Sequence, residues 1–165
     1  MATVNTKSAL VQAHDAHPKT PIDIKYFDGT QRKAVATVEA AAGDSNGSTY
    51  RMIPVYSGWS IDEIMLLNDA MGSGAAYHVG LYETAANGGG AVDADVYAAS
   101  ADVASAGADD VAFHTRDIAD AAQAIWQDAG LSKDPNKWYD LVVTAATAGA
   151  NAGTLTVRVR YTDGT

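Results

Sequence analysis

The feature that most constrains this chain is a strict alternation of side chains from Thr154 to Thr162. Every second position carries a large apolar or aromatic residue: Leu155, Val157, Val159 and Tyr161. Threonines and arginines occupy the positions between them. A period of two places the two sets on opposite faces of an extended strand. The pattern therefore predicts a half-buried strand of an antiparallel sheet, with one face on a core and the other in solvent.

Other segments of the chain have a similar strand-like pattern and are separated by turn-forming residues. The predicted strands cover residues 22–27, 33–39, 49–56, 60–67, 76–82, 138–146 and 154–162. Pro54 cannot donate a hydrogen bond to a neighbouring strand, so we expect its strand at a sheet edge or a bulge. Segments 61–67 and 75–84 flank a connection of small residues, which indicates a β-hairpin or a β-arch. About eight short strands fit an antiparallel β-sandwich or jelly roll rather than a βαβ fold.

One segment changes from a strand period to a helical period. Its larger side chains and alanines recur three or four positions apart: Ile118, Ala122, Ile125, Trp126 and Ala129. An acidic first turn suits the positive end of a helix dipole, and Gly130 can end the helix. We therefore expect a single amphipathic helix at about residues 117–129, packed on the flank of the sandwich with Ile125 and Trp126 buried.

The first twenty residues are polar, and Pro18 disfavours the helical conformation of the residue before it. We expect residues 1–20 to form an extended N-terminal arm and residues 21–165 to form a single β-sandwich domain. A chain of 165 residues is long enough for one domain with a core. Much of its apolar content is alanine, so the core should be modest. Association with a partner or with copies of the chain is one common source of further stability.

The composition excludes several classes of partner and chemistry. A net charge of −9 at pH 7 opposes binding to phosphate backbones, so we expect no nucleic-acid partner. The absence of cysteine excludes disulfides, thiolate catalysis and cysteine-based zinc sites. No apolar run approaches the roughly 18 residues of a membrane span, and no signal-peptide pattern follows the N-terminus. We therefore expect no membrane partner.

No motif in the sequence predicts a catalytic, cofactor or metal site. The four histidines show no ligand spacing typical of a metal site: His14, His17, His78 and His114. Carboxylates are so common that pairs of them do not indicate the acid and base of a glycoside hydrolase. A better lead is the set of aromatic residues that can stack on sugar rings if several line one face: Tyr50, Tyr56, Trp59, Tyr82, Tyr97 and Trp138.

Five segments of the sequence resemble small structural proteins of tailed bacteriophages. They are residues 68–74, 79–89, 117–126, 134–139 and 154–161, and the resemblance covers roughly residues 50–163. The resemblance implies a jelly-roll cement or decoration protein, with the major capsid protein as its partner. Such a protein sits on the capsid exterior as a dimer or trimer and clamps neighbouring capsomers. It implies no catalytic residue.

Under this hypothesis the arm and one sheet edge contact the capsid, through His14, His17, Tyr50, Tyr56 and Trp59. The protein would be made in the host cytoplasm and located on the virion exterior. An acidic protein suits the outside of the shell because packaged DNA repels it.

Two alternatives remain open. A carbohydrate- or host-receptor-binding module of the virion, at a head fibre or the tail, requires an exposed row of aromatic side chains. A glycosidase requires a cleft with two carboxylates of shifted pKa.

Overall fold

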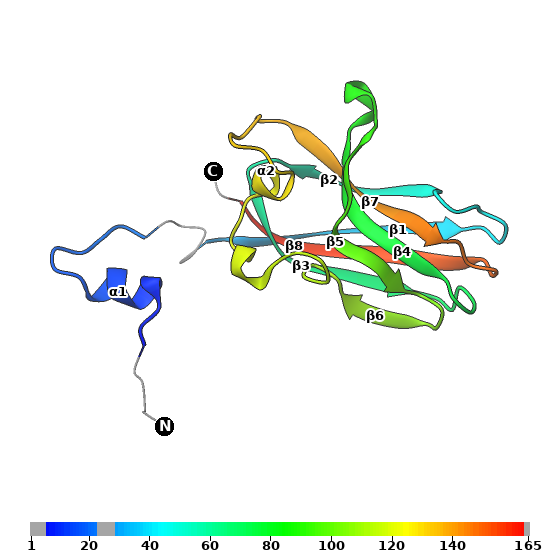
Figure 1. The fold of residues 1–165 in the computed structure, drawn as a ribbon, viewed down its shortest axis with the longest axis horizontal. Helices are drawn as coiled ribbons and strands as arrows, with labels where there is room; N and C mark the ends of the chain where they lie inside the picture. Colours follow the sequence, from blue (N-terminus) through cyan, green and yellow to red (C-terminus); the bar gives the residue numbers. More distant parts are fainter. Residues whose placement is uncertain (1–5, 23–28, 164–165) are drawn as a thin grey trace.

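The computed structural model describes residues 6–22 and 29–163. In this part of the chain eight strands form two antiparallel four-stranded sheets, packed face to face (Figure 1). The strands are β1 (Gln31–Ala40), β2 (Thr49–Tyr56), β3 (Trp59–Asn68), β4 (Ala76–Glu83), β5 (Ala91–Asp102), β6 (Gly107–Asp110), β7 (Trp138–Thr147) and β8 (Gly153–Asp163). The helices are α1 (Ala9–Asp15) and α2 (Ile125–Asp128), with short 3-10 helices at Ala85–Asn87 and Ile118–Asp120.

The strand order is that of a jelly roll. One sheet has the order β1-β8-β3-β6, and the other has the order β2-β7-β4-β5. Except between β4 and β5, each strand is followed by a strand of the opposite sheet, which gives the Greek-key connections of this architecture. The prediction of a mainly β antiparallel sandwich is therefore confirmed. The segments 61–67 and 75–84 lie in different sheets, so their connection is a β-arch and not a hairpin.

The core lies between the sheets and is built from alternate strand residues. In β8, Leu155, Val157 and Val159 are fully buried, as the period of two predicted. The largest fully buried side chains are three tyrosines on three different strands: Tyr77, Tyr97 and Tyr139. These three large rings fill space in the core that the many small alanine side chains of this sequence cannot fill.

Two of the observed strands, β5 and β6, lie between the predicted strands at residues 76–82 and 138–146, where the sequence pattern predicts no strand. β5 crosses β4 at very short range at Gly80. A Cβ atom at this position would collide with the backbone of Asp93 and Ala94, so no residue other than glycine fits. The register between β4 and β5 shifts on both sides of this crossing. An irregular pairing of this kind hides the alternation that identifies a strand.

The edge position predicted from Pro54 is confirmed, because β2 is the edge strand of its sheet. The β2–β7 ladder also has a bulge between Arg51 and Ile53. The strand predicted at residues 22–27 lies, apart from Ile22, outside the described residues. This strand therefore stays a prediction.

The prediction of one helix over residues 117–129 is wrong in its length. The α-helix covers only Ile125–Asp128, and Ile118 is 81% exposed. The Arg116 guanidinium donates to the carbonyl oxygens of Asp120 and Gln123. In a continuous helix the Asp120 carbonyl would accept from the backbone N–H of Ala124, but here it accepts from Gln123 and from Arg116.

The chain enters α2 from an extended residue. Ala124 has φ −78° and ψ 156°, and it forms an isolated β-bridge with Ser60. The backbone N–H of Trp126 then donates to the carbonyl of Ser57 in the β2–β3 turn. As predicted, Ile125 is buried, whereas Trp126 is only half-buried. The small helix therefore packs at one end of the sandwich.

The N-terminal segment contains a helix where the sequence predicted an extended arm. The Ser8 hydroxyl accepts a hydrogen bond from the backbone N–H of Val11 and caps α1. Pro18 lies beyond the last helical residue, Asp15, so it does not interrupt the helix. In Figure 1, α1 lies apart from the two sheets. The division into an arm of residues 1–20 and a domain of residues 21–165 stays a prediction.

Candidate functional site

Four aromatic side chains meet at one end of the sandwich. They come from the end of β2, the start of β3, the start of β7 and the end of β8: Tyr56, Trp59, Trp138 and Tyr161. Sheet pairing brings them together, because Tyr56 lies opposite Trp138 in the β2–β7 ladder. We call these four residues the aromatic cluster.

The rings of the aromatic cluster form a continuous series of contacts. Trp59 stacks on Tyr161, with ring centroids 4.0 Å apart and an interplanar angle of 14°. Trp138 meets Trp59 edge to face, with ring centroids 5.3 Å apart, and the ring of Tyr56 lies at the same centroid distance from Trp138. Trp138 is 47% exposed, whereas Tyr161 is buried. The cluster thus offers one exposed tryptophan on a rigid aromatic base, the kind of side chain that anchors protein interfaces.

Hydrogen bonds hold the loop before β7 and so fix the position of Trp138. The Ser57 hydroxyl donates to Asp134 at 2.5 Å and accepts from the backbone N–H of Lys137 at 3.1 Å. The Tyr56 hydroxyl donates to the Asn136 side chain at 3.1 Å. The Lys137 ammonium donates to Glu83 on β4 at 2.6 Å, and this hydrogen bond raises the pKa of Lys137. The surface around Trp138 is therefore pre-organised.

A buried ion pair fastens α2 to the same end of the sandwich. Arg116 Nε lies 3.0 Å from Asp128 Oδ1, and the two side chains are only 3% and 2% exposed. The Tyr97 hydroxyl also donates to Asp128, at 3.0 Å. Burial raises the pKa of Asp128 to about 6, although Arg116 and the tyrosine hydrogen bond oppose that change. Burial likewise raises the pKa of Tyr97 well above its usual value. Because these groups are enclosed, they stabilise the fold and do not face a ligand.

Residues 6–22 and 29–163 contain no group of three or more His, Cys, Asp or Glu side chains arranged to hold a metal ion. No helix in the same ranges has the length and apolar character to cross a membrane. A hollow of about 160 Å³ lies on the N-terminal segment, lined by Leu10, Val11, His14 and Ile22.

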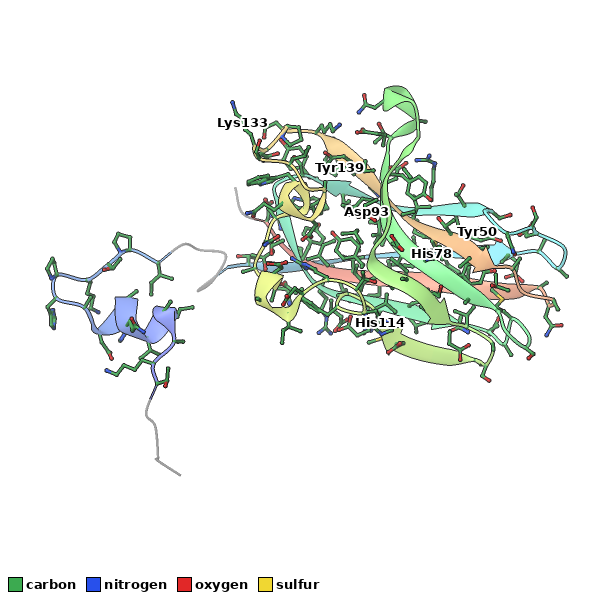
Figure 2. The ribbon with its side chains drawn as sticks, in the orientation of Figure 1. Tyr50, His78, Asp93, His114, Lys133 and Tyr139 are labelled. Atoms are coloured by element: carbon green, nitrogen blue, oxygen red, sulfur yellow. The ribbon has the colours of Figure 1, made fainter. Side chains whose placement is uncertain are left out.

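The structure places the five predicted interface residues in three separate regions. His14 lies in α1, with Nδ1 3.6 Å from Asp15 Oδ1, and His17 is exposed beyond the helix. Tyr50 lies at the start of β2, at the end of the sandwich opposite Tyr56. Figure 2 shows Tyr50 far from Lys133, which precedes β7 on the cluster side.

Tyr50 also differs from the aromatic cluster in its surroundings. Its hydroxyl donates to Asp44 at 2.6 Å, and its ring lies 6.0 Å from that of Tyr77. Burial and this hydrogen bond raise the pKa of Tyr50. Both the hydroxyl and the ring of Tyr50 therefore make contacts within the protein.

Tyr56 and Trp59 are the two predicted residues that the structure brings together, and the predicted set omitted their partners Trp138 and Tyr161. Trp138 was recognisable as a candidate exposed aromatic. Tyr161 belongs to the apolar face of an alternating strand, so the alternation predicts a core position for it. The missing information was the pairing of β7 with β2 and of β8 with β3.

No protein-family model matches this sequence, and no curated protein matches it. Two solved structures contain chains of similar fold. A chain of the cyanophage Pam1 capsid asymmetric unit is 15% identical, with a TM-score of 0.51, and the match covers 98% of this chain and 99% of that one. A chain of the Ralstonia phage GP4 capsid is 15% identical, with a TM-score of 0.57, and the match covers 83% of this chain and 86% of that one. The fold is one found in phage capsids.

Proposed function

We propose that this protein is a structural component of a bacteriophage virion that binds the outside of the capsid as a cement or decoration protein. The observation that carries the proposal is the jelly-roll likeness to a chain of the Pam1 capsid structure over almost the full length of both chains. The net charge of −9 fits an exterior position, because packaged DNA repels an acidic protein. The partner would be the major capsid protein, and the role is mechanical and not catalytic.

We assign the capsid contact to the N-terminal arm and to the aromatic cluster. The arm carries an exposed apolar side chain, Val11, beside the hollow lined by His14. The cluster presents Trp138 on a base that hydrogen bonds hold in place. A pre-organised aromatic anchor binds with little loss of side-chain entropy, which favours a tight contact with a rigid shell.

Cosedimentation with capsid shells that lack this protein tests the proposal. We expect saturable binding, and we expect decorated shells to withstand heating and low salt better than bare shells. Shells that bind no protein at any concentration, with the protein recovered instead in tail fractions or on glycans, would contradict it.

Two variants test which surfaces make the contact. Trp138→Ala should weaken shell binding by about ten-fold or more, because aromatic anchors dominate interface energies. Ile118→Ala is the control, because it also shortens an exposed apolar side chain, which is 81% exposed, but lies outside the aromatic cluster. Removal of residues 1–20 should leave a folded domain that occupies the shell poorly. Full occupancy by the truncated protein would exclude a role for the arm.

A second candidate is a carbohydrate- or host-receptor-binding module of the virion. The grouping of Trp138 with Tyr56 and Trp59 favours it, because an exposed ring beside others can stack on a sugar. Titration calorimetry with host surface glycans separates the two functions. Glycan binding that Trp138→Ala abolishes, together with no binding to shells, would establish this second function.

A further inference from the structure

β1 is a long edge strand that has neither a bulge nor a proline. In the part of the chain that the structure describes, β8 is the sole strand paired with β1. The β1–β8 register runs without a bulge from Gln31 to Ala40, and the ten residues contain no proline. Natural edge strands are usually short, bulged or interrupted, because a straight edge offers its free backbone groups to another chain. β1 therefore offers backbone N–H and C=O groups with which a strand of another chain can pair.

The side chains of β1 suit a strand that gains a second neighbour. On the inward face, Ala34, Ala36 and Val38 pack against the core but are only partly buried. On the outward face, Val35 is 57% exposed, in the middle of the strand. A strand added along this edge would cover both the partly buried inward residues and the exposed valine.

We propose that β1 pairs antiparallel with β1 of a second copy of this chain, across a two-fold axis at Ala36. In this register Lys33 of each copy lies directly opposite Glu39 of the other, and both side chains are exposed. Val35 lies opposite Thr37 on the same face. Opposite charges in directly opposed positions stabilise a strand pair, and the symmetry supplies the pair twice.

Neighbouring registers lack this complementarity. Residues opposed across an antiparallel pair share a face, so a symmetric register must be centred on a residue and can move only by whole residues. Centring on Val35 places Lys33 opposite Thr37, and centring on Thr37 places Val35 opposite Glu39. Among these three registers, only the one centred on Ala36 opposes the lysine to the glutamate.

The proposed dimer joins two four-stranded sheets into one sheet of eight strands. Its interface is a single strand pair, so we expect weak association that is visible at protein concentrations of about 0.1 mM. The strand pair of the proposed dimer is formed by β1 alone, and none of the residues of the aromatic cluster belongs to β1. The dimer goes beyond the proposed capsid function and does not depend on it.

Sedimentation velocity on the purified full chain tests whether Lys33 of one copy lies opposite Glu39 of the other. We expect concentration-dependent dimers that Lys33→Glu or Glu39→Lys weakens by about 30-fold, because each variant replaces two attractive pairs with two repulsive ones. The double variant with both substitutions exchanges the charges and should restore dimerisation. Circular dichroism should show equal folding in all four proteins. A monomer at every concentration, or single variants that dimerise like the parent, would overturn the proposal.

A cysteine placed on the two-fold axis tests the geometry. The chain has no cysteine of its own, so a single introduced thiol gives an unambiguous product. Ala36→Cys should form an intermolecular disulfide under mild oxidation, because opposed residues lie within disulfide range. Ala34→Cys is the matched control on the same face, since its two copies would lie about 13 Å apart. Cross-linking of the control and not of the axial variant would refute this register.

If the full chain is a monomer, sedimentation velocity on a truncated chain shows whether another part of the same chain blocks the edge of β1. If residues 22–27 of the same chain cover the edge of β1, removing residues 1–28 should expose it and produce dimers. That outcome would overturn a dimer of the full chain. Shell binding is measured separately, so a failure of the dimer proposal leaves the capsid proposal intact, and a failure of shell binding leaves the dimer proposal intact.

Discussion

Replacing Arg116 with methionine tests how the buried ion pair holds the end of the sandwich. The guanidinium donates to the Ile61 carbonyl at 3.1 Å and to the Asp120 carbonyl at 2.6 Å, beside its pairing with Asp128. Methionine retains much of the side-chain volume but removes the guanidinium donor from these oxygens and from the Asp128 carboxylate. Removing one partner of a buried ion pair typically costs about 3–5 kcal/mol. A domain of ordinary stability has only about 5–15 kcal/mol to lose.

Urea unfolding followed by tryptophan fluorescence measures this loss, with Arg32→Met as the matched control. Arg32 also faces a carboxylate, Asp163, at 3.5 Å, but its side chain is 58% exposed. An exposed pair of this kind contributes at most about 1 kcal/mol. Equal losses for the two variants, or a loss below about 1 kcal/mol for Arg116→Met, would refute the reasoning that burial makes the difference.

Three further changes test other parts of the fold. Because the folded-state pKa of Asp128, about 6, lies above its ordinary value of 3.8, the folded protein binds this proton more readily. Stability should therefore rise by about 1 kcal/mol from pH 7 to pH 5, and urea midpoints that are equally pH-dependent in Asp128→Asn would contradict this. Gly80→Ala should give insoluble protein or cost at least about 4 kcal/mol, whereas Gly90→Ala, with open space for its methyl group, should be near neutral in the same assay. Tyr97→Phe removes a hydrogen bond to Asp128 and should cost about 1–2 kcal/mol in thermal unfolding; an unchanged midpoint would show that this bond contributes nothing.

The fold class could be predicted because, in several strands, residues that will be buried alternate along the sequence with residues that will be exposed. The alternation from Leu155 to Tyr161 specifies which face of β8 enters the core, and Pro54 specifies an edge. β5 escaped prediction because its pairing with β4 is irregular around Gly80, so its side chains do not alternate regularly between buried and exposed. Local patterns report a strand well only when its pairing is regular.

The helix and the candidate site depended on contacts that no local pattern contains. The spacing of apolar residues after Asp117 is helical, yet Arg116 binds the carbonyls that a continuous helix would need. Tyr56 and Trp59 could be named as interface candidates, but Trp138 reaches them only through the β2–β7 pairing. In both cases a tertiary interaction overrides or completes what the local sequence indicates.

β1 and β8 are neighbours in one sheet although more than a hundred residues separate them, and this affects how the protein folds during synthesis. β8 is the strand partner of both β1 and β3, and it follows the other described strands in the sequence, so it leaves the ribosome after them. Until then β1 cannot join its sheet, because it lies next to β8 and Gln31 pairs with Thr162. Folds dominated by such distant pairings form slowly, over roughly milliseconds to seconds. In a nascent chain β1 and β3 therefore lack the partner that joins them until β8 has been translated, and their unpaired edges are open to aggregation during that interval.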